Sequence, residues 1–292
     1  MMKRNINATS QGKRADVGEY KINRILPNSN VDAVGPFVFL DHLLPAKHSP
    51  NEPIEVVSGK GAHPHRGIAT LTYVLNGEAD HFDSAGHHAK VKSGGLQWMK
   101  AGSGIIHDEA LNVDESANDL LTHGLQFWIN LPSRQKTEPP DYIPVQSNEV
   151  PKKLLKDDAG WLKVIAGEFE DLISKIPSYS KQFLYHIHVN SRKAFSIDTK
   201  KDSEYAAFLP LNNSWINGTD FAPGEFLLFE NSDGSIEIGS LSQGAADVML
   251  FGGEPYTEPI IAQGPFVMNT LQEIATAYTD FHLGKYGKIT YQ

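Results

Sequence analysis

Two pairs of side chains that could bind a metal ion lie within residues 61–109. His63 and His65 form one pair, and His107 and Glu109 form the other, each with one residue between its members. Because successive residues of an extended strand point to opposite faces, this spacing places both members of a pair on one face. Two such strands facing each other across a small barrel would aim three imidazoles and one carboxylate at a single point. The sequence therefore predicts a four-ligand metal site.

This ligand set has the chemistry of a catalytic or sensing site. Imidazole suits iron, copper, nickel and zinc, and a carboxylate also admits manganese. Four protein ligands leave two positions of an octahedral ion open to a substrate or to dioxygen. We therefore expect one divalent transition metal with a role beyond structure.

The spacing alone is a weak signal, because the chain holds 12 histidines and His186 and His188 repeat it. The first pair differs in its surroundings. Residues 68–75 form an apolar, strand-like run, and Asn76 and Gly77 after it predict a hairpin turn. No His-x-Glu follows the His186 pair, so we expect no metal in the second half of the chain.

Most of the chain reads as short strands separated by turns, which is typical of a jelly roll. At 292 residues it has room for two domains of about 100–150 residues each. We expect an all-β fold of two tandem jelly-roll barrels, residues 1–135 and 161–292. A proline-rich connection over 136–160 separates them, since proline cannot continue a central strand. A capping box at Thr270–Glu273 predicts a short C-terminal helix.

Several long motifs resemble those of the pirins, a family of the cupin superfamily. They occur in the family's order and extend over nearly the whole chain: GPFVFLDH (35–42), HPHRGIAT (63–70), GGLQWM (94–99), AGSGIIHDE (101–109), HGLQFWINLP (123–132) and GPFVMNT (264–270). The resemblance implies a bicupin whose first barrel holds iron through His63, His65, His107 and Glu109. Manganese, nickel, copper and zinc stay open as alternatives.

Three positions depart from the family pattern. Ala69 stands where the family has a carboxylate, Gly95 replaces an aspartate, and Ser103 replaces a common arginine. None of them removes a ligand. We expect them to alter the charge and width of the pocket mouth, and Ala69 in particular to count against a flavonol as the natural substrate.

Some pirins resemble quercetin 2,3-dioxygenases, which cleave the heterocyclic ring of a flavonol with dioxygen. The resemblance thus favours a dioxygenase acting on a flavonol or a related aromatic hydroxyl compound, with Glu109 as general base. Trp98, Met99, Phe127 and His123 are candidate substrate contacts near the site. Two alternatives remain. One is a metal-binding regulatory protein that modulates a transcription or metabolic partner, and the other is a zinc or manganese enzyme that uses Lewis acidity.

Composition restricts the other classes of function. The formal net charge of −9 disfavours a nucleic-acid surface, which needs clustered basic residues. The chain has no cysteine, so disulfides, thiolate ligands and a cysteine nucleophile are excluded. Residues 1–15 lack the apolar region of a secretory signal, and no apolar run is long enough to span a membrane. We expect a cytoplasmic protein, and the composition points to no particular protein partner.

Overall fold

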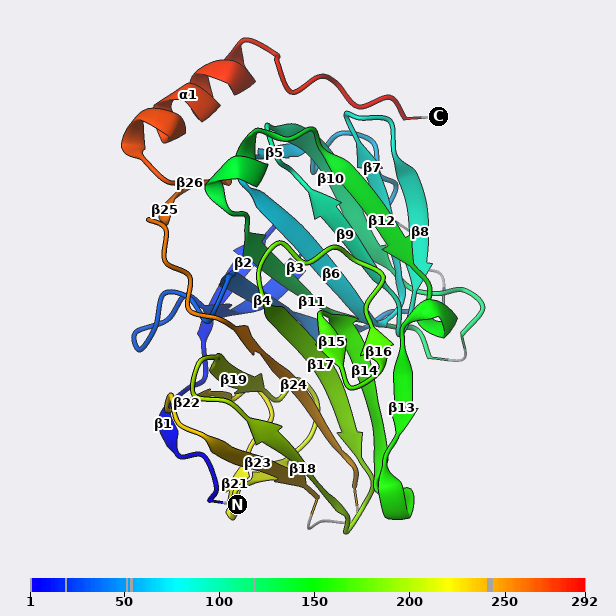
Figure 1. Ribbon diagram of the computed structural model, residues 1–292. Helices are drawn as coiled ribbons and strands as arrows, with labels where there is room; N and C mark the ends of the chain where they lie inside the picture. Colours follow the sequence, from blue (N-terminus) through cyan, green and yellow to red (C-terminus); the bar gives the residue numbers. More distant parts are fainter. Residues whose placement is uncertain are drawn as a thin grey trace. The chain divides into compact units, whose positions relative to one another are not determined.

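Strands dominate the computed structural model, which describes residues 2–18, 20–50, 52, 55–117, 119–240 and 244–291. Within these residues there is one α-helix, α1 (Leu271–His282), at the end of the chain (Figure 1). Three 3-10 helices are short: η1 (Ser133–Thr137), η2 (Ser147–Glu149) and η3 (Lys156–Asp158). The predicted all-β fold class with a short C-terminal helix is confirmed. Among the described residues, no helix has the length and apolar character needed to cross a membrane.

The chain folds into two compact units, and neither is continuous in sequence. The unit that carries the predicted ligands, called the metal-site unit below, comprises Asp16–Ile22, Leu40–Glu149 and Thr257–Gln292. The second unit comprises Met1–Ala15, Asn23–Phe39 and Val150–Tyr256. The units therefore exchange segments, whereas the ranges expected from the sequence were contiguous.

Strand pairing explains this exchange of segments. Strand β1 (Ile6–Ser10) pairs antiparallel with β22 (Phe226–Phe229) in the second unit. At the other end of the chain, Phe266 bridges to Arg66 in the metal-site unit. Each terminal segment thus follows its hydrogen-bonding partner rather than its neighbours in the sequence.

Two sheets supply the strands of the metal-site unit. The four-stranded sheet has the order β5-β10-β7-β8, made of β5 (His63–His65), β10 (Ile105–Asn112), β7 (Glu78–Asp83) and β8 (His88–Lys92). The seven-stranded sheet has the order β12-β9-β6-β11-β4-β3-β2. Its strands are β12 (Asp141–Val145), β9 (Leu96–Lys100), β6 (Ile68–Asn76), β11 (Leu121–Asn130), β4 (Phe37–Lys47), β3 (Tyr20–Leu26) and β2 (Lys13–Val17). Three strands of this larger sheet, β2, β3 and β4, also include residues assigned to the second unit.

The hairpin expected at Asn76 and Gly77 is wrong. Strand β6, before this turn, belongs to the seven-stranded sheet, and β7, after it, belongs to the four-stranded sheet. Gly77 has a φ of +98°, and a Cβ there would lie 2.3 Å from the carbonyl oxygen of Asn112. The glycine therefore turns a corner between sheets, which uses the same left-handed backbone as a hairpin turn.

The proline-rich connection contains an edge strand. Strand β12 includes Pro144 and lies at the end of the seven-stranded sheet, paired with β9 on one side. Proline is tolerated at such a position because an edge strand leaves one side of its backbone unpaired. The range 136–160 thus contributes β12 to one unit and β13 (Lys152–Leu154) to the other.

The second unit is also built from two sheets. The seven-stranded sheet has the order β1-β22-β19-β24-β17-β14-β13. Its strands not yet described are β19 (Glu204–Phe208), β24 (Ala246–Gly253), β17 (Gln182–Val189) and β14 (Gly160–Ala166). The four-stranded sheet has the order β18-β23-β20-β21, from β18 (Ala194–Thr199), β23 (Gly234–Gly239), β20 (Ser214–Ile216) and β21 (Thr219–Phe221). Buried apolar side chains from both sheets, such as Ile187 and Ile236, form its core. A small hairpin joins β15 (Glu168–Phe169) to β16 (Leu172–Ile173).

The C-terminal segment is a hairpin followed by the helix. Strand β25 (Ile261–Gln263) pairs with β26 (Phe266–Met268), and α1 follows directly (Figure 1). The Thr270 hydroxyl accepts a hydrogen bond from the Glu273 amide, and the Glu273 carboxylate accepts one from the Thr270 amide, so the predicted capping box is confirmed. Gly284 follows the helix with a φ of +73°, as expected of a residue just past a helix C-terminus.

Candidate metal centre

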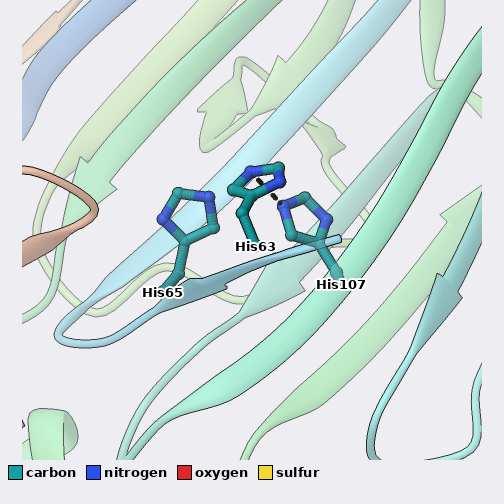
Figure 2. A group of neighbouring side chains, drawn as sticks. All are labelled: His63, His65 and His107. Carbon is teal, nitrogen blue, oxygen red and sulfur yellow. Dashed lines mark hydrogen bonds between the residues drawn. The ribbon is translucent and has the colours of Figure 1, made fainter. Parts of the chain in front are cut away.

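Antiparallel pairing of β5 and β10 brings the predicted histidines together. In this register His107 lies directly opposite His63, and Ile105 lies opposite His65. Because His63 and His65 are two residues apart on one strand, their side chains share a face. Figure 2 shows the three imidazoles converging from the two strands. The i, i+2 reasoning from the sequence thus holds for the histidines.

The three rings are close enough to share one ion. Their centroids are 4.4 Å apart for His63 and His107, 4.9 Å for His63 and His65, and 5.0 Å for His65 and His107. The Nε2 atoms of His63 and His107 are 3.0 Å apart. Within the described residues, these three side chains can place nitrogens within 4.8 Å of one another. This is the spacing of donors around a single first-row ion.

Backbone carbonyls orient two of the rings. Nδ1 of His63 lies 2.8 Å from the carbonyl oxygen of Gly61, and Nδ1 of His65 lies 3.0 Å from that of Pro265. A carbonyl accepts but cannot donate, which assigns the proton to Nδ1 in both rings and leaves each Nε2 with a lone pair. The Nε2 of His65 is buried, and among the described residues it has no hydrogen-bond partner. A buried acceptor in this state fits a metal ligand, and the carbonyl contact is the usual way of fixing its orientation.

Burial keeps the imidazoles of His65 and His107 neutral. It lowers the pKa of His65 to about 3, with the nearby His63 adding to the effect. Burial also lowers the pKa of His107 well below its usual range, as do His63 and His65 beside it. Neutral imidazole is the form that binds metal. The donors therefore suit a divalent transition metal at neutral pH.

Glu109 lies beside His107 and is held by side-chain amides. Its carboxylate accepts hydrogen bonds from Nε2 of Gln97, at 2.8 Å, and from Nε2 of Gln126. Together with His107 and His81 it forms a second group of possible ligands, with atoms within 4.8 Å of one another. Glu109 is thus fixed in place beside His107, one of the three histidines.

Sequence reasoning missed the two glutamines. Gln97 and Gln126 lie on β9 and β11, and each is directly opposite Thr72 of the central strand β6. Each glutamine lies between two apolar residues of its strand, and this was the available signal in the sequence. A polar side chain at such a position marks a strand face that does not belong to the apolar core.

A cavity of about 340 Å³ opens onto this centre. His63 and Glu109 line it together with Thr72 and Gln126, and its other walls are largely apolar. The volume is within the range of small-molecule sites.

Two of the four predicted substrate contacts lie on the wrong face of the sheet. Trp98 and Phe127 are both opposite Leu71 of β6, which alternates with the Thr72 that lines the cavity. Both are almost fully buried, at 1% and 0% exposure. Since a shift of one residue reverses the face, their neighbours point toward the centre instead. Trp128 is the clearest example, because its ring lies 4.9 Å from that of His65.

The other two predicted contacts also fail to line the cavity. Met99 packs in an apolar cluster with Ile68 and Tyr142. His123 is fully buried, and its Nε2 lies 2.6 Å from Nε2 of His42. Both side chains thus have structural contacts of their own.

The family departures lie away from the cavity as well. Ala69 alternates with Thr70 and Thr72 on β6, so it faces the opposite side of the sheet and is 1% exposed. At Gly95 a Cβ would lie 2.7 Å from the carbonyl oxygen of Val145, which leaves no room for a larger side chain on this backbone. Ser103 is not among the lining residues either. The expected effect of Ala69 on the pocket therefore has no geometric basis.

In the second unit, His186 and His188 share one acceptor. His186 Nε2 is 3.0 Å and His188 Nδ1 is 2.8 Å from the same carboxylate oxygen of Asp247. The other carboxylate oxygen accepts a hydrogen bond from Asn212. Trp161 stacks on the His188 ring.

Comparison with known proteins assigns the family. The profile named Pirin matches residues 19–129, and the profile named Pirin C-terminal cupin domain matches residues 184–287. A Pseudomonas aeruginosa protein named provisionally as a quercetin 2,3-dioxygenase is 31% identical over 253 residues, which is 87% of each chain. The chain belongs to the pirin family. The resemblance seen in its motifs is confirmed, and so is the bicupin fold.

Solved structures agree with this assignment. This pirin resembles a quercetin 2,3-dioxygenase from Acinetobacter baumannii with a TM-score of 0.88 and 26% identity, over 99% of this chain and 100% of that one. A bacterial pirin from Escherichia coli in complex with nickel(II) matches with a TM-score of 0.61 and 20% identity, over 87% of this chain and 98% of that one. The second likeness shows the shared fold.

The C-terminal segment holds the histidine strand of this pirin in place. The Pro265 carbonyl accepts a hydrogen bond from Nδ1 of His65. In addition, the Asp280 carboxylate of α1 forms an ion pair with Arg66 at 2.7 Å. The ammonium of Lys136, 1% exposed, donates to the carbonyl oxygens of Gly67 and Val267. These contacts link the turn after β5 to β26, which explains why α1 belongs to the metal-site unit.

We predict that His107→Ala removes the metal and leaves the fold intact. The ring is the donor that β10 contributes opposite β5, and its loss leaves two histidines on a single strand. We expect metal content per chain, measured by mass spectrometry after chelator-free purification, to fall at least about tenfold. The control is His88→Ala, an exposed histidine of β8 paired with Asp80. Full metal content in the His107 variant would show that the ligand assignment is wrong.

We also predict a pH-dependent loss of stability from the pair of His42 and His123. Burial lowers the pKa of His123 to about 4, below the unfolded value of about 6.5. Between these values the unfolded chain binds a proton that the folded chain does not, so the unfolding free energy falls as the pH falls. The contribution is at most about 1.4 kcal/mol per pH unit.

Urea unfolding at a series of pH values tests this prediction. His123→Gln should unfold with a shallower pH dependence than the parent protein over this window, while His282→Gln, at an exposed position of α1, should retain the parent slope. Equal slopes for the parent and His123→Gln would contradict the assignment.

Proposed function

We propose that this pirin is a metal-dependent dioxygenase that acts on an aromatic hydroxyl compound of the flavonol type. The observation that carries the proposal is the cluster of His63, His65 and His107, with Glu109 beside His107 and with His63 and Glu109 lining a cavity. We assign His63, His65, His107 and Glu109 as the ligands of one ion, with iron as the first candidate. The likeness to a quercetin 2,3-dioxygenase structure supports the reaction class.

The metal ion and the side chains around it have separate roles in the proposed reaction. A bound first-row ion supplies Lewis acidity toward a hydroxyl group and redox activity toward dioxygen. The Glu109 carboxylate takes the hydroxyl proton, because it lines the cavity beside His107. Gln97 and Gln126 fix the carboxylate so that no reorganisation is needed when the proton arrives.

The cavity walls complete the binding of the substrate. Leu43, Ala79 and Leu111 give an apolar surface for a flat ring system, while Thr72 and Gln126 offer polar atoms near the ligands. Apolar walls with a few placed polar groups are typical of small-molecule sites.

Metal analysis combined with oxygen uptake tests the proposal. The protein is mixed anaerobically with quercetin, dioxygen is then admitted, and absorbance and oxygen concentration are followed together. We expect about one redox-active metal per chain, and oxygen consumption that requires both the metal-loaded protein and quercetin. Stoichiometric metal with no oxygen uptake would overturn the assigned flavonol activity and favour a regulatory role or another substrate.

Glu109→Gln tests the general base. The substitution keeps the size of the side chain but cannot accept the proton, and its amide would face the donors of Gln97 and Gln126. We expect the rate of oxygen uptake to fall by about 10²–10⁴. The control is Glu168→Gln, at an exposed position of β15. Because Glu109 is also a proposed ligand, rates are compared per bound metal, and an unchanged rate on that scale would exclude it as the base.

A further inference from the structure

A second cavity lies against the first. It has a volume of about 410 Å³ and shares four lining residues with the cavity at the metal centre: Tyr20, Leu43, Glu55 and Leu111. The proposed ligands His63 and Glu109 line the first cavity and not the second. The shared residues thus form a wall between the first cavity, which is lined by proposed metal ligands, and the second cavity, which is not.

Hydrogen bonds close this wall. The Tyr20 hydroxyl donates to Oε2 of Glu55, at 2.7 Å, and accepts from the backbone amide of Leu111, at 2.9 Å. Burial raises the pKa of Tyr20, so the phenol keeps the proton that it donates. The phenol is therefore tied on two sides, to a side chain and to strand β10.

Glu55 is held at its backbone as well. The side chain of Asn112 accepts from the Glu55 amide at 2.9 Å and donates to the Glu55 carbonyl at 3.0 Å. Asn112 ends β10, the strand that also carries His107 and Glu109. The wall is thus built on the same strand as the candidate metal centre.

The second cavity offers mainly apolar surface close to the wall. Leu44, Pro45 and Val113 line it, and the pair of His48 and Glu52, at 2.9 Å, lies among its polar residues. An apolar extension of a ligand would therefore be accommodated there if the wall were open.

We propose that Tyr20 and Glu55 form a partition that sets the length of the aromatic hydroxyl ligand accepted at the metal centre. The partition confines the parent protein to compounds that fit the first cavity, and its removal joins the two spaces. This inference rests on the proposed function in that it places the ligand's hydroxyl end at the histidines.

The test is a binding series with catechols that carry alkyl chains of increasing length at the 4-position. Affinity is measured by calorimetry on the metal-loaded protein under anaerobic conditions, so no turnover is needed. Each methylene group buried against apolar surface should tighten binding about fourfold. In the parent protein this gain should stop when the chain reaches the partition. In Tyr20→Ala it should continue over several further methylene groups.

Two further variants keep the test decisive. Tyr20→Phe retains the ring and loses both hydroxyl contacts, so it should move the length limit in the same direction even if Tyr20→Ala does not fold. Leu44→Ala changes the second cavity alone. It should leave every affinity unchanged in the parent background and weaken only the long-chain ligands in the Tyr20→Ala background.

The outcomes separate this inference from the proposed function. An identical length limit in the parent and in both Tyr20 variants would overturn the partition while leaving the dioxygenase intact. A shifted limit without oxygen uptake on any aromatic hydroxyl compound would overturn the dioxygenase and support the partition. A uniform loss of affinity at all lengths would show that Tyr20 only supports the first cavity, and would also overturn the partition.

Discussion

The candidate centre depends on the antiparallel pairing of β5 with β10. This pairing sets His107 opposite His63, and the alternation of side chains along β5 adds His65 to the same face. A register shift of one residue would turn one strand's donors away from the other's. Carbonyl contacts at Gly61 and Pro265 then aim the imidazole lone pairs inward. A strand of only three residues is thus held in place by its partner strand and by segments distant in sequence.

The C-terminal segment takes part in the same arrangement. It supplies the Pro265 carbonyl, the Asp280 partner of Arg66 and one acceptor of the buried Lys136 ammonium. A buried ammonium is tolerated only when its hydrogens find acceptors. Bonds between β26 and the turn after β5 therefore join the end of the chain to the strand that carries two candidate ligands.

Glu109 illustrates how a single carboxylate serves two roles in the proposed mechanism. Gln97 and Gln126 donate hydrogen bonds to it, which fixes its position beside His107. The same face of the sheet carries Trp128 next to His65. Sequence reasoning placed several aromatic residues near the centre, but the side chain of Trp98, one of them, lies on the other face. Choosing between adjacent residues of a strand requires its register against a neighbour, and the sequence of one strand does not contain it.

The sequence by itself determined the donor types, their i, i+2 spacing, the all-β class and the helix with its capping box. These follow from local rules, since strand alternation and end-capping depend on residues a few positions apart. Only the tertiary structure decided which strands face one another, which face of each strand meets the cavity, and that both ends of the chain cross between units. It also decided that Asn76 and Gly77 form a corner between sheets and that Ala69 lies away from the cavity. These features depend on long-range pairing, for which local sequence provides no rule.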